Sequence, residues 1–115
     1  MKVLVCGSRH FADREKIFRD LDVLHAEHHF DWLIEGGATG VDSHASAWAA
    51  TRGVQHDTFW ADWSNYGFAA GPMRNKRMLT EGKPDIVVAF PGGDGTADMV
   101  RRARSAGVKV LEVLG

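Results

Sequence analysis

The sequence is poor in cysteine and proline, with one cysteine, Cys6, and three prolines in 115 residues. A single cysteine cannot form an internal disulfide, which favours a reducing compartment. Cys6 ends the apolar run 3–6, where a small buried side chain is expected. That run is far shorter than the roughly 7–15 apolar residues of a signal peptide, and no segment approaches the ~20 residues that cross a bilayer. We therefore expect a cytoplasmic protein without a membrane partner.

The sequence also lacks an excess of charge of either sign. Its 14 lysines and arginines face 15 aspartates and glutamates, which gives a formal net charge of −1 at pH 7. No overall positive field would hold a polyanion such as duplex DNA, so any anion site must be local. This disfavours nucleic acid as a partner, although a local groove escapes the argument. His25, His28 and His29 have helical spacing but no nearby cysteine or acidic set, so we expect no metal site.

Strand-like and helix-like segments alternate along the chain, and 115 residues fit a single domain, 1–115, with a real core. Short apolar and β-branched runs predict strands, and apolar residues at helical spacing predict helices. Asp13 is a possible cap for the first helix, and Pro72 suits the first turn of the third. The predicted strands are 2–6, 31–35, 54–59, 86–90 and 108–113, and the predicted helices are 13–28, 41–52, 72–81 and 96–106.

Five strands alternating with four helices predict an α/β domain with a parallel sheet, because right-handed crossovers of this length return the chain to the same edge. The expected strand order is 3-2-1-4-5. In that order the chain reverses direction across the sheet between the first and fourth strands, and ligands bind there, at the carboxyl ends of the strands. The loops that meet at this edge, 7–13, 36–40 and 91–95, all carry glycine.

The segment "FPGGDGT", residues 90–96, places three glycines directly after an apolar run. Glycine lets the backbone approach a ligand, and Gly95 and Thr96 lie where the last helix begins, so free amides and the helix dipole face a phosphate or carboxylate. The alternative is that these glycines only permit a tight turn. The pattern lacks the lysine of a P-loop and is not the G-x-G-x-x-G of dinucleotide binders, so neither triphosphate hydrolysis nor NAD chemistry is favoured.

Four blocks also carry a family resemblance: "VCGSRHFAD", "EGGATGVDSHASAWA", "DWSNYGFAAGPMRNKRML" and "FPGGDGTADMVRRAR". In this order and spacing they resemble the SLOG superfamily, and within it the YspA/YpsA-related (cpYpsA-related) small proteins. The resemblance implies a Rossmann-like three-layer sandwich with helices on both faces of the sheet, which binds a nucleotide or nucleotide derivative. "PGGDGT" is also similar to LOG-type phosphoribohydrolases, which release a base from a nucleoside monophosphate. "GGATGVDSHA" and "RNKRM" are similar to the DNA-processing protein DprA.

The block "GPMRNKRM" supplies a cation for the crevice. The guanidinium of Arg74 can make two charge-assisted hydrogen bonds to a phosphate or hold a ribose-linked oxygen, with a surface salt bridge as the alternative. Arg9 and Ser8 can add phosphate contacts, and Asp42 either accepts from a ribose hydroxyl or caps the helix 41–52. The predicted ligand site therefore consists of Gly7, Ser8, Arg9, Gly36, Gly37, Asp42, Arg74, Asn75, Pro91, Gly92, Gly93, Asp94, Gly95 and Thr96.

Five aromatic residues lie in the segment 59–68. Such rings commonly cover a core edge or fill a subunit interface, and we expect at least a dimer that uses part of this segment. One ring could instead stack on a base, and Trp63 is the candidate because the resemblance includes it.

Catalysis is the open question. In the phosphoribohydrolases the glycine motif continues to a glutamate three residues after the threonine, and here that position is Met99, which has no proton to exchange. Arg74 and Asp94 are the remaining catalytic candidates. The sequence therefore favours a sensor or accessory protein that binds a small nucleotide-like ligand and needs no cofactor. The alternatives are an N-glycosidase acting on nucleoside 5′-monophosphates and a DprA-like binder of single-stranded DNA.

Overall fold

The computed structural model describes residues 1–114. Its five strands form one parallel sheet in the order β3-β2-β1-β4-β5, as predicted. The strands are β1 Lys2–Cys6, β2 Trp32–Glu35, β3 Gln55–Thr58, β4 Ile86–Ala89 and β5 Lys109–Glu112. The helices are α1 Arg14–His28, α2 Val41–Arg52, α3 Trp63–Tyr66, α4 Ala70–Thr80 and α5 Asp94–Ser105, with a 3-10 turn η1 at Gly67–Ala69.

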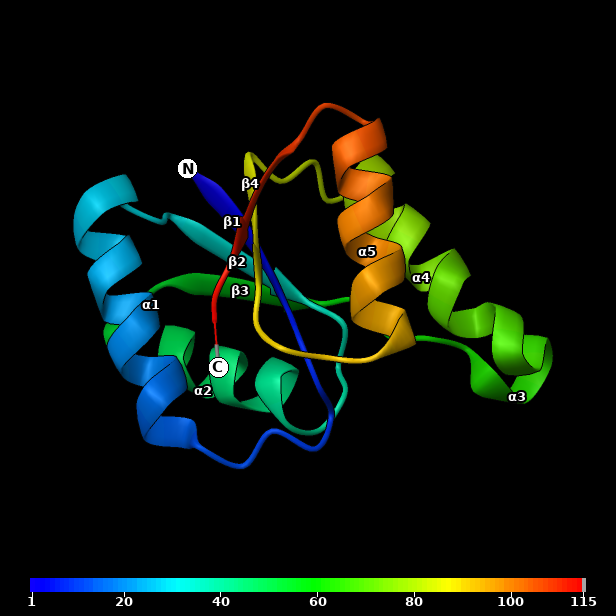
Figure 1. The fold of residues 1–115 in the computed structure, drawn as a ribbon, viewed down its shortest axis with the longest axis horizontal. Helices are drawn as coiled ribbons and strands as arrows, with labels where there is room; N and C mark the ends of the chain where they lie inside the picture. Colours follow the sequence, from blue (N-terminus) through cyan, green and yellow to red (C-terminus); the bar gives the residue numbers. More distant parts are fainter. Residues whose placement is uncertain (115) are drawn as a thin grey trace.

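Helices cover both faces of the sheet, which gives the three layers of a Rossmann-like sandwich (Figure 1). Side chains alternate between the faces along a strand. In β1, Val3 and Val5 belong to the core beneath α1 and α2, whereas Leu4 belongs to the core beneath α4 and α5. β1 is the central strand, because it pairs with β2 on one side and β4 on the other.

The first two helices are fixed by local caps and by a shared polar contact. The Asp13 side chain accepts a hydrogen bond from the Lys16 amide and caps α1, as predicted. The buried indole of Trp48 in α2 donates to Asp22 of α1 at 2.8 Å, and Arg52 makes two further bonds to the same carboxylate. This contact satisfies the polar atom of a large buried ring, which would otherwise carry a desolvation cost.

The segment between β3 and α4 differs from the sequence prediction. No predicted strand or helix covers residues 60–71, but Asp62 caps the four-residue helix α3, which leads through η1 into α4. α4 consequently begins two residues earlier than the predicted helix 72–81. In Figure 1, α3 lies at the outer end of α4, away from the sheet. Among residues 1–114, none of the helices combines the length and the apolar composition that a membrane span requires.

Candidate functional site

A cleft of about 620 Å³ opens at the carboxyl ends of β1 and β4, where the strand order reverses. This is the place that the predicted topology assigns to a ligand. The cleft, called the crevice below, is lined by all three glycine-bearing loops and by α4 and α5. Of the predicted site residues, it brings together Gly7, Ser8, Arg9, Gly36, Asp42, Trp63, Arg74, Asn75, Gly93, Asp94, Gly95 and Thr96.

Three predicted ligand residues lie outside the crevice lining. Gly37 lines a separate, smaller hollow with Trp60 on the other side of the loop 36–40. Pro91 and Gly92 line a groove between α5 and the end of β5. A Cβ atom at Gly92 would collide with the Thr96 side chain, so this glycine is explained by packing within the loop.

The amino-terminal turn of α5 presents free backbone donors to the crevice. Among the residues that the structure describes, no side chain caps this helix, and the Ala97 amide is its first with a backbone acceptor, Gly93 O at 3.0 Å. Within residues 1–114, the amides of residues 94–96 have no acceptor. Uncapped amides and the positive end of a helix dipole together favour an anion.

Arg74 extends from α4 into the crevice and is partly held by the protein. Its Nη1 donates to the carbonyl of Gly36, and its Nε donates to the Asn75 side chain at 3.0 Å. Burial lowers the pKa of the guanidinium, and the neighbouring carboxylates Asp42 and Glu35 oppose that shift. Nη2 remains for a ligand, because within residues 1–114 it has no hydrogen-bond partner. Arg74 can therefore offer a ligand one nitrogen with two hydrogens in a fixed position.

Asp42 is the acidic group of the crevice and is only 6% exposed. Its Oδ2 accepts from the Ala38 amide at 3.2 Å, and Gly40 occupies the cap position of α2, so Asp42 holds the loop before the helix and does not cap it. Burial raises the pKa of Asp42 to about 6, the Ala38 amide opposes that rise, and the negative charge of Glu35 adds to it. A carboxyl group that titrates so near neutrality can accept or donate a hydrogen bond.

Sulfur-containing side chains form part of the crevice wall. Cys6, Met78 and Met99 all line it, and burial raises the pKa of the Cys6 thiol to about 12. Cys6 is thus a neutral thiol and not a nucleophile at ordinary pH. Met99 is buried, and its thioether lies at the position where the resemblance would place a catalytic glutamate.

The neighbouring carboxylates of α5 do not take the place of that glutamate. Asp98 accepts bonds from Asn75, Arg101 and Arg102 at 2.9, 2.5 and 2.9 Å. These contacts lower its pKa against the opposing effect of burial, so Asp98 links α4 to α5 as a structural carboxylate. Asp94 lines the crevice from the exposed first turn of α5.

The loop after β1 is fixed over the crevice by backbone contacts. The Ser8 amide donates to Pro91 O at 2.9 Å, and the Val41 amide donates to Ser8 O at 3.1 Å, so this residue joins all three glycine-bearing loops. His44 of α2 adds a contact of 3.0 Å to Phe11 O. Arg9 and His10 remain exposed at the crevice mouth.

Sequence reasoning missed Glu35, which ends β2 and is 1% exposed. Its carboxylate accepts from the Gly37 amide at 2.7 Å and from the Thr58 hydroxyl at 2.6 Å, so it braces the loop 36–40 from behind. Desolvation raises its pKa. The available signal was a lone acid at the end of an apolar strand, directly before two glycines. His10, Ala38, Thr39 and Met78 also line the crevice and were not predicted.

The fold and the crevice define a Rossmann-like α/β domain with a cleft at its glycine-rich edge. The sequence profile of the YspA, cpYpsA-related SLOG family matches residues 1–66. The Gene 61 protein of Mycobacterium phage D29 is 36% identical over 120 residues, which cover 96% of this chain and 94% of that protein. The chain belongs to the YspA, cpYpsA-related SLOG family, which confirms the resemblance.

Two solved structures share the fold. The X-ray structure of TM1055, a structural genomics target, has a TM-score of 0.73 at 22% identity and covers 95% of this chain and 71% of TM1055. DNA processing protein A (DprA) from Streptococcus pneumoniae has a TM-score of 0.55 at 18% identity, with 96% of this chain and 58% of that chain covered. This chain thus corresponds to little more than half of that DprA structure.

Proposed function

We propose that the crevice binds a small phosphorylated nucleoside or nucleotide derivative, and that the protein acts as a sensor or accessory protein. The observation that carries this proposal is the convergence, in one cleft of about 620 Å³, of the uncapped amides of α5, the partly free guanidinium of Arg74 and the buried carboxyl of Asp42. N–H groups that can donate to a phosphate, beside a carboxyl group that can accept from a hydroxyl, suit a sugar phosphate.

The arrangement suggests how such a ligand would lie. Its phosphate would contact the amides of 94–96, with Arg74 and the exposed Arg9 supplying positive charge. A ribose hydroxyl would then donate to Asp42, and Trp63, which lines the crevice and is 58% exposed, would cover the base. Stacking of a base on an aromatic ring is worth roughly 1–3 kcal/mol in nucleic-acid systems.

The test is a thermal-shift screen over nucleoside mono- and diphosphates. A ligand at 100 times its dissociation constant should stabilise the protein by about 2.7 kcal/mol. Arg74→Ala should remove this shift while the circular dichroism spectrum stays native. Arg19→Ala, which truncates an exposed arginine of α1, is the matched control and should keep it. A ligand that binds the Arg74→Ala variant with native affinity would place the site elsewhere.

Met99 separates a binder from a phosphoribohydrolase. General acid–base help is typically worth ~10²–10⁴ in rate, and a thioether cannot supply it, so we expect little or no release of adenine from AMP by the native protein. Met99→Glu should restore slow cleavage, and Met99→Gln, of similar size but without the acid, should not. The measurement is free base by chromatography after overnight incubation. Rapid native turnover that survives Met99→Ala and disappears in Asp94→Asn would instead assign catalysis to the glycine loop.

The likeness to DprA motivates one alternative, binding of single-stranded DNA. The formal net charge of −1 gives no general attraction to a polyanion. Retention on an immobilised oligonucleotide that falls steeply with added salt would favour this alternative over the small-ligand proposal.

We also propose that the protein self-associates through an exposed apolar surface on the loop before α3 and on α3, η1 and α4. Its large side chains are exposed: Trp60 69%, Trp63 58%, Tyr66 53%, Phe68 99% and Met73 42%. Phe59, at the start of the predicted aromatic segment, packs against the core and does not belong to this surface. A monomeric mass by light scattering at tens of micromolar protein would contradict the proposal, and Phe68→Ser should reduce association in a dimeric protein.

A further inference from the structure

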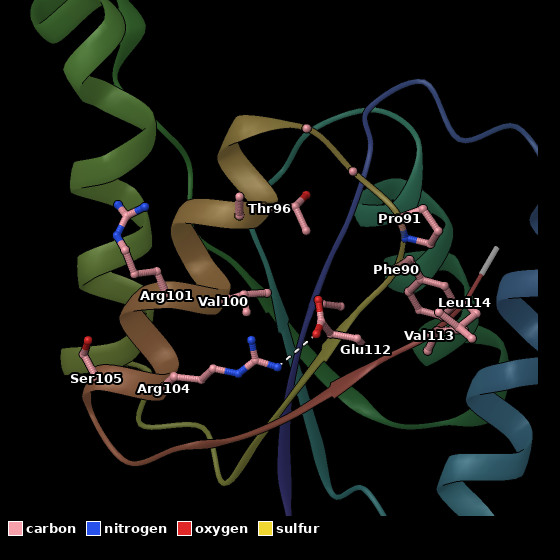
Figure 2. A pocket seen from close by; sticks show the side chains of 14 residues that line it. Phe90, Pro91, Thr96, Val100, Arg101, Arg104, Ser105, Glu112, Val113 and Leu114 are labelled. Carbon is pink, nitrogen blue, oxygen red and sulfur yellow. Dashed lines mark hydrogen bonds and ion pairs between the residues drawn. The ribbon is translucent and has the colours of Figure 1, made fainter.

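A second hollow, of about 810 Å³, lies beside the crevice between α5 and the ends of β4 and β5. We call it the α5–β5 groove. In Figure 2, Val100 of α5 faces Phe90, Pro91, Val113 and Leu114 across it. The walls are therefore largely apolar, and both Pro91 and Leu114 are exposed to solvent there.

One end of the groove is closed by an ion pair. Arg104 of α5 reaches across to Glu112 of β5, with Nη2 to Oε2 at 2.9 Å (Figure 2). Arg101, on the same helix, is directed toward α4 in Figure 2 and pairs with Asp98. The closed end thus offers a guanidinium donor and a carboxylate acceptor beside apolar walls.

The other end of the groove meets the crevice. Both hollows are lined by Gly93 and Thr96, so the first turn of α5 stands between them. At Gly93 a Cβ atom would meet no atom of residues 1–114 within 4 Å, and the φ of −97° at this residue does not require glycine. The missing side chain therefore leaves space over the backbone of Gly93, a residue that lines both hollows.

We propose that the α5–β5 groove is a second subsite for a two-headed nucleotide, whose phosphates cross Gly93 while one nucleoside lies in the crevice and the other in the groove. The proposal rests on the proposed function, because it uses the same anion donors at α5. A flat, apolar ring with hydrogen-bonding edges matches the groove, since its walls are apolar and its closed end carries Arg104 and Glu112. The ligand class would then be two nucleosides joined through their 5′-phosphates, held by the first turn of α5 and not by the G-x-G-x-x-G loop of the common dinucleotide binders.

Isothermal titration with AMP, ADP and diadenosine 5′,5′-diphosphate tests the proposal. The groove predicts that the two-headed compound binds at least about tenfold more tightly than ADP, because a second base gains a buried surface. Ala97→Trp should abolish the higher affinity of the two-headed compound without lowering the affinity for AMP, since Ala97 is an exposed residue of the groove wall. Ala50→Trp places the same ring on an exposed site of α2 and should change nothing.

A second variant avoids reliance on a bulky substitution. Arg104→Ala removes the ion pair at the closed end, and it should reduce the affinity for the two-headed compound alone. One outcome is that AMP and ADP bind the native protein and lose affinity in Arg74→Ala, while the two-headed compound binds no more tightly than ADP. In that case the groove proposal is wrong and the proposed function stands. If neither these three compounds nor any nucleotide of the thermal-shift screen binds the native protein, both proposals are wrong.

Discussion

The loops after β2 and β4 have similar glycine content, but their glycines have different causes. In the loop 36–40 a Cβ atom at Gly36 would collide with the Arg74 guanidinium, and one at Gly40 would collide with the backbone of the loop after β1. At Gly93 and Gly95 a Cβ atom would meet no atom of the described residues within 4 Å. The first loop needs glycine to close against its own protein. In the second, nothing within residues 1–114 fills the space that Gly93 and Gly95 leave open, as expected where a ligand approaches the backbone.

The largest expected effect is on stability and lies in the loop after β2. Gly40→Ala combines a φ of +72° with a steric collision against backbone, so we expect a loss of about 3 kcal/mol or more in the free energy of unfolding by urea. Gly53→Ala is the matched control, because its φ of +71° is similar but a Cβ atom there meets nothing within 4 Å. It should cost only about 1–2 kcal/mol. Equal losses would show that the collision does not matter.

The second effect is a pH dependence that arises from Asp42. Its pKa rises from 3.8 to about 6 on folding, so the native state binds the proton more tightly than the unfolded chain does. Stability should therefore fall as pH rises from about 4 to about 6, by about 1–3 kcal/mol. Asp42→Asn should lose this component. The difference between native and variant unfolding curves isolates it, because Glu35, which shifts in the same direction, is present in both. An unchanged pH profile in the variant would contradict it.

The third effect is on binding and lies in the loop after β4. Gly93→Val should lower the affinity for a nucleotide ligand by at least about tenfold, because the side chain would occupy the space that a phosphate needs. Its cost in stability should be only the roughly 1 kcal/mol by which valine is a poorer N-cap residue than glycine, since within residues 1–114 no atom lies within 4 Å of the new Cβ atom. Gly53→Ala, at the far end of α2, should keep native affinity. If Gly93→Val binds a nucleotide with native affinity, the ligand does not contact this loop.

The smallest effect has opposite signs in stability and binding. Gly95 lies in the first turn of α5, where alanine is a better helix former by roughly 0.5–1 kcal/mol. Gly95→Ala should therefore stabilise the free protein by about that amount and lower its affinity for the ligand. If Gly95→Ala is stabilised and still binds a nucleotide with native affinity, the two loops differ only in turn geometry and not in contact with a ligand.

Much of the fold could be predicted, because its signals are local. The bounds of β1 and α2 agree with the prediction, since each segment ends at a glycine, Gly7 and Gly53. The strand order followed from the alternation of strands and helices and from right-handed crossovers. The helix α3 was missed because four residues are too short to show a 3.6-residue period, and its cap, Asp62, had no periodic segment behind it.

The candidate site could be predicted by position but not by contact. That Arg74 and Asp42 would share a cleft followed from the topology, but the bond of Arg74 to Gly36 and the bond of Asp42 to Ala38 depend on the packing of separate segments. The sequence likewise could not show that Gly92 is required by packing within its loop, whereas Gly93 lies at an open surface. A motif in the sequence does not distinguish these two uses of glycine.

Asn75 has a consequence for how a ligand would be received. Its side-chain nitrogen donates both to Gly95 O at 3.2 Å and to the buried Asp98 at 2.9 Å. The helix that carries Arg74 is thereby fastened to the turn that carries the free amides, through groups shielded from water. The two halves of the proposed anion site are thus held in register before any ligand binds. Binding would then proceed with little loss of conformational entropy, so the association should be fast and free of a slow closing step.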